Sequence, residues 1–193
     1  MPSLKEQLAD ALDRFDGDAN VGTLFDTLRA LVRDAEIDDL IAAAEPLKDR
    51  PEIMIPVYEH VVAKRPDHAR SLVILANAYW ITGRGPDMVS DLAERAKRAD
   101  PANRGAWHLW ALAEGDVRAR VARWTMVSQQ FPEDQLARAA LADNAAGLAG
   151  AEHDPLALDL AVRTYEGLLA EAETPTQRRA LEQTLETLKG WKL

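Results

Sequence analysis

Apolar residues recur along most of the chain at intervals of three and four positions. A clear stripe is formed by Val21, Leu24, Phe25, Leu28, Leu31 and Val32. This spacing places side chains on one face of an α-helix, whereas a half-buried strand needs alternation with a period of two, which no segment sustains. Alanine, leucine, glutamate and arginine, which favour helices, are also abundant. The pattern therefore predicts an all-α chain of about eleven helices.

Short turn signals separate the predicted helices. Clusters containing glycine, proline or aspartate stand at 16–18, 49–51, 83–86, 100–101, 115–116, 131–133, 153–155 and 174–175. Because short connections force neighbouring helices to lie antiparallel, we expect consecutive helical hairpins. No low-complexity linker interrupts them, so we expect a single domain over residues 1–193. Helices within 3–34 begin this domain, and 176–189, with a thin apolar stripe and a polar back, suits a terminal cap.

Three segments of the chain end in the same way. Their closing prolines, Pro66, Pro101 and Pro132, stand 35 and then 31 residues apart. In the middle unit, Leu75-Ala76 is followed three residues later by Tyr79 and then by the turn glycine Gly83. A repeat of this length indicates stacked supersecondary units, because a single hairpin cannot bury its own apolar face.

This pattern resembles the tetratricopeptide repeat (TPR), a helix–turn–helix unit of about 34 residues. The resemblance is best over 69–132 and weaker over 36–68. The repeats are degenerate: the middle unit has one extra residue in its 83–86 turn, the next lacks three residues before Gly115, and Ala93 replaces a large aromatic residue. The resemblance implies a right-handed α–α superhelix, a solenoid of antiparallel helix hairpins. Sister families of helical repeats share the same hairpin logic and remain alternatives.

Charge and composition narrow the classes of function. The chain has 32 acidic and 23 basic residues, a net charge of −9, which argues against binding to nucleic acid or to an anionic membrane. It has no cysteine, which excludes disulfides and thiolate metal sites. No apolar leader segment and no run of about eighteen apolar residues is present. We therefore expect a cytoplasmic protein.

No catalytic or metal-binding motif stands out. The four histidines form no H-E-x-x-H pair, and neither a Walker loop nor a G-x-S-x-G motif is present. Residues 16–20 place oxygen ligands as a calcium loop would, but Val21 and Thr27 stand where that loop needs glycine and glutamate. A polar turn that caps the next helix explains these residues better. We expect no enzymatic activity, no metal and no cofactor.

Candidate binding residues follow from the resemblance. In the TPR family the first helices of the repeats line a concave groove that holds extended peptides. The residues this implies here are Val73, Asn77, Trp80, His108 and Trp110. Trp107 instead matches a packing position. Asn77 aligns with an asparagine of the family's carboxylate clamp, but Val73 replaces the clamp lysine and Ile74 the neighbouring basic residue. We therefore expect an apolar or mixed peptide ligand, not a chaperone tail.

A group of arginines offers a second candidate surface. Arg118, Arg120 and Arg123 crowd one predicted helix and would suit an acidic partner, or else form a solvated face balanced by the acidic ends of the chain. The leading hypothesis is a non-enzymatic scaffold that binds a peptide or helix of a partner protein. The alternative is a structural homodimer that self-associates through the same repeat surface, and incomplete terminal repeats would also allow end-to-end stacking. An all-α enzyme or metal protein is a third hypothesis.

Overall fold

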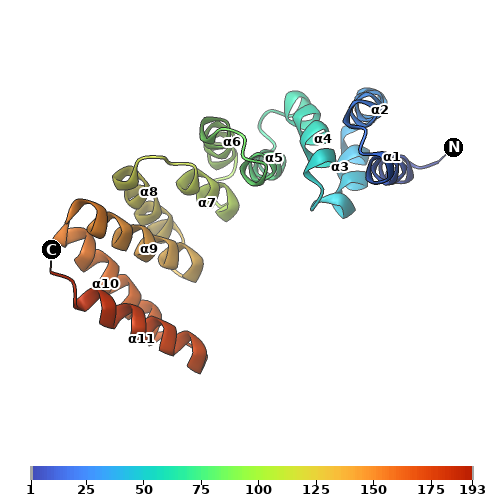
Figure 1. The fold of residues 1–193 in the computed structure, drawn as a ribbon. Coiled ribbons are helices and arrows are strands. Elements are labelled where there is room, and N and C mark those ends of the chain that lie inside the picture. Colours follow the sequence, from blue (N-terminus) through green and yellow to red (C-terminus); the bar gives the residue numbers. More distant parts are fainter. Residues whose placement is uncertain (1, 193) are drawn as a thin grey trace. The chain divides into compact units, whose positions relative to one another are not determined.

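The computed structural model describes residues 2–192, and α-helices joined by short turns build this part of the chain (Figure 1). Its elements are α1 (Leu4–Asp18), α2 (Val21–Asp34), α3 (Ile37–Ala44), the 3-10 turn η1 (Glu45–Leu47), α4 (Pro51–Lys64), α5 (Ala69–Ile81), α6 (Pro86–Ala99), α7 (Arg104–Leu112), α8 (Val117–Gln130), α9 (Gln135–Glu152), α10 (Pro155–Ala170) and α11 (Pro175–Lys189). The predicted all-α class and the eleven helices are confirmed for the described residues.

The chain forms two compact units, residues 1–109 and residues 110–193. In the first unit, α1 packs against α2 and α3, α4 packs against α2, α3 and α5, and α5 packs against α6. In the second unit, α9 lies between α8 and α10, and α10 packs against α11. Each unit therefore has the sequential hairpin packing that the short turns predict.

Side chains next to the helix ends fix where several helices begin. Ser3 and Glu6 form a capping box at the start of α1, in which the Ser3 hydroxyl accepts from the Glu6 amide and the Glu6 carboxylate accepts from the Ser3 amide. The Asn20 side chain accepts from the amide of Thr23 and caps α2. The loop at 16–20 is thus the polar, helix-capping turn that its residues suggest.

Two prolines have different effects on the first unit. Pro46 lies in the 3-10 turn η1 that follows α3, where the chain changes direction. Pro56 lies inside α4, which continues through it. Because proline has no amide hydrogen, the carbonyl of Glu52 loses its usual helical donor at that point.

The predicted apolar stripes form the core of each hairpin. In α5 the buried residues include Leu72, Leu75, Ala76 and Tyr79, and in α6 they are Val89, Leu92, Ala93 and Ala96. The small residues let the two helices approach closely, as the repeat pattern requires. In α11, Leu185 and Leu188 are buried, while Arg179, Glu182 and Glu186 are exposed. This helix covers α10 with its apolar side and turns a polar side to water.

Candidate functional site

One side of α5 lies outside the hairpin core. We call this side the α5 stripe, which consists of Val73, Ile74, Asn77, Trp80 and Ile81. Its members follow one another at helical spacings of three and four residues and so share a face. Trp80 is 41% exposed and Ile81 is 58% exposed, although both are large hydrophobic residues. The packing of the helix therefore leaves apolar surface uncovered where the sequence predicted binding residues.

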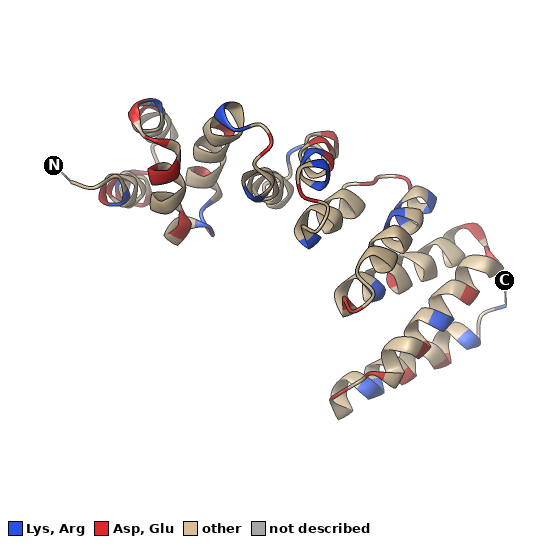
Figure 2. Cartoon of the chain, turned by 180° about the vertical axis from the view of Figure 1, so that it is seen from behind, with Lys and Arg blue, Asp and Glu red and all other residues tan. Residues whose placement is uncertain are grey.

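The α5 stripe carries no charge. The single charged residue of α5 is Arg70, and Figure 2 draws most of this helix in tan, the colour of residues other than Lys, Arg, Asp and Glu. The Arg70 guanidinium donates to the Glu45 carboxylate at 2.9 Å. Within the stripe, the Asn77 amide offers both donors and an acceptor, and the Trp80 indole N–H can also donate. The surface is thus apolar and uncharged, with two groups that can hydrogen-bond.

A hollow of about 260 Å³ lies along the α5 stripe, between α5 and the start of α4. Its lining residues are Lys48, Asp49, Pro51, Met54, Val73, Ile74, Asn77, Ala78 and Ile81. The two charges in this lining have opposite sign. The hollow brings the sequence-predicted Val73 and Asn77 together, and the exposed Trp80 lies on the same helical face.

The Val73 side chain packs against α7 at Gly105. A Cβ atom built on Gly105 would lie 3.2 Å from Cγ1 of Val73, which is tighter than an ordinary van der Waals contact. Glycine at this position therefore allows the Val73 side chain to lie directly on the α7 backbone. This contact explains why Val73 is half-buried while Asn77, one turn later, is exposed.

The other predicted groove residues lie on α7. His108 is half-buried and belongs to the first unit. Trp110 is half-buried and belongs to the second unit, where the Arg123 guanidinium lies 4.7 Å from its ring centroid and donates to its backbone carbonyl at 2.6 Å. Trp107 is half-buried rather than enclosed. Its indole N–H donates to the Pro101 carbonyl at 2.9 Å, and Lys97 lies over its ring.

The three predicted arginines of α8 all make contacts within the second unit. Arg118 forms ion pairs with Glu152 and Asp154, which raise the pKa of its guanidinium. Arg120 donates to the Asn144 side chain at 2.8 Å. Arg123 forms an ion pair with Glu114 at 2.7 Å. An acidic partner would have to compete with these internal acceptors.

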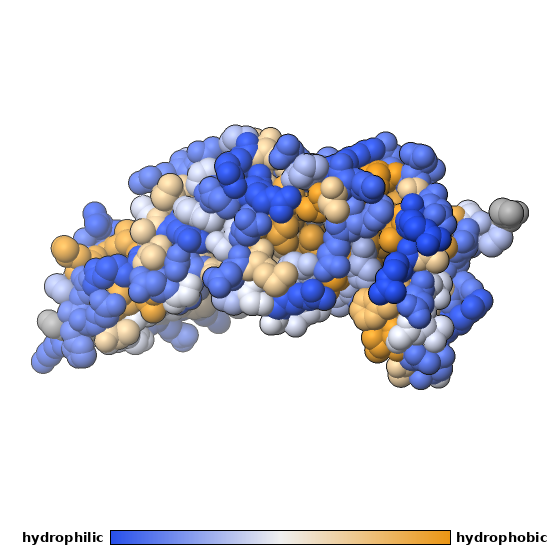
Figure 3. Space-filling model, turned by 90° about the horizontal axis from the view of Figure 1, so that it is seen from above, coloured by the Kyte–Doolittle hydropathy of each residue, from blue (hydrophilic) through white to orange (hydrophobic). Residues whose placement is uncertain are grey.

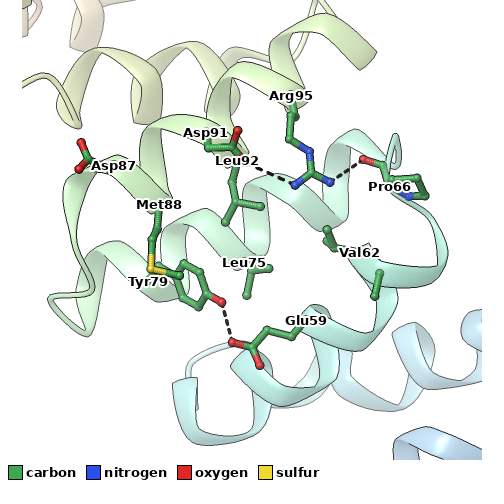
Figure 4. Close-up of a pocket in the computed structure, with 11 residues that line it drawn as sticks. Glu59, Val62, Pro66, Leu75, Tyr79, Asp87, Met88, Asp91, Leu92 and Arg95 are labelled. Carbon is green, nitrogen blue, oxygen red and sulfur yellow. Dashed lines mark hydrogen bonds and ion pairs between the residues drawn. The ribbon is translucent and has the colours of Figure 1, made fainter.

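A second and larger hollow, of about 680 Å³, lies between α4 and α6 above α5. Figure 4 shows Leu75 and Tyr79 of α5 at its floor, with residues of α4 and α6 on either side. The Tyr79 hydroxyl donates to the Glu59 carboxylate at 2.6 Å. Burial, together with this hydrogen bond, raises the pKa of Tyr79 to about 12. The sequence pattern does not predict this hollow, because its walls come from three separate helices.

In the loop at 16–20, which resembles a calcium loop, the aspartate oxygens accept hydrogen bonds from other residues of the protein. The Asp16 carboxylate receives two hydrogen bonds from Arg50, at 2.6 and 2.9 Å, and the Asp18 carboxylate accepts from the Asn20 amide at 2.8 Å. Within residues 2–192, no three histidine, aspartate or glutamate side chains gather as metal ligands would. No helix in this part of the chain is both long enough and apolar enough to cross a membrane.

Comparisons with known proteins show which solved structures this fold resembles. No protein-family model matches the sequence, and no curated protein is similar enough in sequence to match it. Two crystal structures of MamA resemble the chain with TM-scores of 0.62 and 0.60, at 13% and 14% identity. They cover 84% and 90% of this chain and 96% and 98% of their own.

A third solved structure, TTC0263, is described as a thermophilic TPR protein in Thermus thermophilus. It has a TM-score of 0.53 and 14% identity, and the match covers 97% of this chain and 99% of that one. At such identities the likeness concerns the fold, which the degenerate repeat pattern had also indicated. The chain therefore has a TPR-like fold.

Proposed function

We propose that this protein is a non-enzymatic scaffold that binds a segment of a partner protein along the α5 stripe. The observation that carries the proposal is the hollow of about 260 Å³ beside an uncharged helix face with two exposed large hydrophobic side chains. Such exposed apolar surface is the usual mark of an interaction site in a protein that folds around a separate core.

The chemistry of the stripe points to one kind of ligand. Trp80 and Ile81 offer large apolar contacts, and tryptophan is among the side chains enriched at the energetic centres of interfaces. The Asn77 amide can donate to a peptide carbonyl and accept from a peptide amide. The ligand we propose is therefore an uncharged peptide segment with apolar side chains, whose backbone hydrogen-bonds to Asn77.

A displayed peptide library tests this proposal. Peptides selected on the wild-type protein would be synthesised with a fluorophore, and their dissociation constants measured by fluorescence anisotropy. We expect Trp80→Ala and Asn77→Ala each to weaken binding by about tenfold or more. Leu136→Ala is the matched control, since Leu136 is 71% exposed and belongs to α9 of the other unit. It should leave the affinity unchanged.

The same experiment defines the limits of the site. Separate His108→Ala and Trp110→Ala variants would report whether ligand contacts reach α7. Peptides that bind all the variants equally, with helicity preserved, would remove the α5 stripe from consideration. A solution mass of twice 21.3 kDa that Trp80→Ala reduces to the monomer value would instead favour self-association through this face.

A further inference from the structure

We propose that the hollow between α4 and α6 is a second protein-binding site, which accepts a basic segment of a partner protein. The segment would insert one apolar side chain and place lysine or arginine residues at the rim. This proposal does not depend on the α5 stripe, because the two hollows have no lining residue in common.

The floor and walls of the hollow are apolar. Leu75 and the ring of Tyr79 form the floor, Val62 and Ala63 line the α4 side, and Leu92 lines the α6 side. Met88, which is 46% exposed, stands beside Tyr79 in Figure 4. From above, hydrophobic side chains gather in a recess bordered by hydrophilic ones in the α4–α6 region (Figure 3). At about 680 Å³ the hollow is within the range of sites that enclose a ligand group.

The charged residues at the rim of the hollow favour an occupant of positive charge. The lining residues include three carboxylates, Glu59, Asp87 and Asp91, and one guanidinium, that of Arg95. Arg95 is already engaged, since it donates to the Pro66 carbonyl at 3.1 Å and pairs with Asp91 at 3.5 Å. Arg84 likewise pairs with Glu59 at 3.4 Å, which leaves the charge of Asp87 as the excess at the rim. An unpaired carboxylate beside an apolar cavity favours a cationic partner, because charge at an interface selects complementary charge.

Among the described lining residues, one carboxylate, that of Asp87, is available to a ligand. Glu59 accepts from the Tyr79 hydroxyl at 2.6 Å and forms an ion pair with Arg84 at 3.4 Å, so its charge is already partly balanced. Asp87 is exposed at the start of α6 and has no ion pair among the described residues. A lysine or arginine of the bound segment could therefore pair with Asp87 at the rim.

A pair of designed peptides provides the probe. Both would be fluorescently labelled amphipathic helices with the same stripe of leucine and methionine, one carrying lysine and the other glutamate on the flanking positions. We expect the lysine peptide to bind the full-length protein and to bind less well as salt is added. The glutamate peptide should not bind.

Matched variants separate the site from a general attraction between opposite charges. The double variant Asp87→Asn, Met88→Ala should weaken binding of the lysine peptide by about tenfold or more. The control is Asp13→Asn, Met126→Ala, which removes one exposed aspartate of α1 and a methionine of α8 that is 47% exposed. This control changes net charge and apolar surface in the same way and should retain wild-type affinity.

Several outcomes would overturn the proposal. They are failure of the lysine peptide to bind, equal binding of the glutamate peptide, and equal weakening by both double variants. A dimer in solution that only the Asp87→Asn, Met88→Ala variant dissociates would show that a second copy fills the hollow instead. Since Asp87 and Met88 lie outside the α5 stripe, none of these results depends on whether a peptide binds the stripe.

Discussion

Helices α5 and α9 bury corresponding positions. Counted from the residue that precedes each helix, His68 and Asp134, the same four positions are buried in both. These are Ser71, Leu75, Ala76 and Tyr79 in α5 and Ala137, Leu141, Ala142 and Ala145 in α9. Because each helix supplies one side of a hairpin core, the fold fixes this face in both units.

The opposite faces of the two helices differ in chemistry. The positions of α9 that correspond to the α5 stripe are Ala139, Ala140, Asp143, Ala146 and Gly147. They are small, apart from Asp143, whose carboxylate accepts a hydrogen bond from the Tyr165 hydroxyl of α10. Large apolar side chains on the outward face of α5 are therefore no requirement of the hairpin. This difference is why we assign binding to α5 and not to α9.

The largest expected effects test the shared face. Leu75→Ala and Leu141→Ala remove side chains that are 3% and 5% exposed at corresponding positions. Each should lower the free energy of unfolding by about 2–5 kcal/mol, because a cavity replaces a packed leucine. Urea unfolding followed by circular dichroism measures both. A cost below about 1 kcal/mol for only one of them would show that the two faces are not equivalent.

A smaller effect is expected at Tyr79, the α5 residue that corresponds to Ala145 of α9. Tyr79→Phe removes the hydroxyl that donates to Glu59 at 2.6 Å. The loss should be about 0.5–1.5 kcal/mol of unfolding free energy, the usual value of one hydrogen bond. Glu59→Gln serves as the comparison, since it keeps an acceptor for the hydroxyl. Equal stability of Tyr79→Phe and the wild type would mean that the bond contributes nothing.

Burial of Tyr79, together with the same bond, makes stability depend on alkaline pH. The pKa of Tyr79 is raised from 10.0 to about 12 in the folded protein, so folding favours the neutral phenol. The contribution is complete below about pH 10 and is lost as the pH rises from about 10 to about 12. Burial and the bond to Asp143 also raise the pKa of Tyr165. Unfolding midpoints measured across this range should fall less steeply in Tyr79→Phe than in the wild type.

Gly147 of α9 gives an effect of opposite sign. A Cβ atom at this position would meet nothing within 4 Å, and the residue lies inside a helix. Gly147→Ala should therefore raise the free energy of unfolding by about 0.4–1 kcal/mol, because alanine loses less backbone entropy on folding. A loss of stability in the urea experiment would show that α9 needs glycine there for another reason.

The smallest effect is expected at Ile81, the α5 counterpart of Gly147. Ile81 is 58% exposed, so Ile81→Ala should change the free energy of unfolding by no more than about 0.5 kcal/mol. If the proposed function is right, the same variant still weakens peptide binding. A large loss of stability without loss of binding would mean that Ile81 belongs to the core of the hairpin and that the α5 stripe is not the binding face.

Local pattern made the helices predictable, but not every stripe proved to be core. The stripe from Val21 to Val32 lies within α2, and Leu24, Leu28 and Val32 are buried, as its spacing suggests. Val21 and Phe25 are nevertheless 50% and 40% exposed. Spacing along one helix fixes which residues share a face, whereas their burial depends on what packs against that face.

The candidate sites show the same division. Val73, Asn77 and Trp80 could be grouped in advance because they lie on a single helix. The α4–α6 hollow could not be predicted, since it depends on how α4 and α6 pack against α5. Arg118 gives a further example: its partner Glu152 stands 34 residues away and comes within reach only through hairpin packing.

The contact between Gly105 and Val73 means that the shape of the α5 stripe depends on a residue that is not part of it. A side chain at position 105 would require Val73 to shift by a few tenths of an ångström. If peptides bind the stripe as proposed, two proteins with identical stripes but different residues at this point of α7 would prefer different peptides. Specificity could then be adjusted from the neighbouring helix, without any substitution in the stripe.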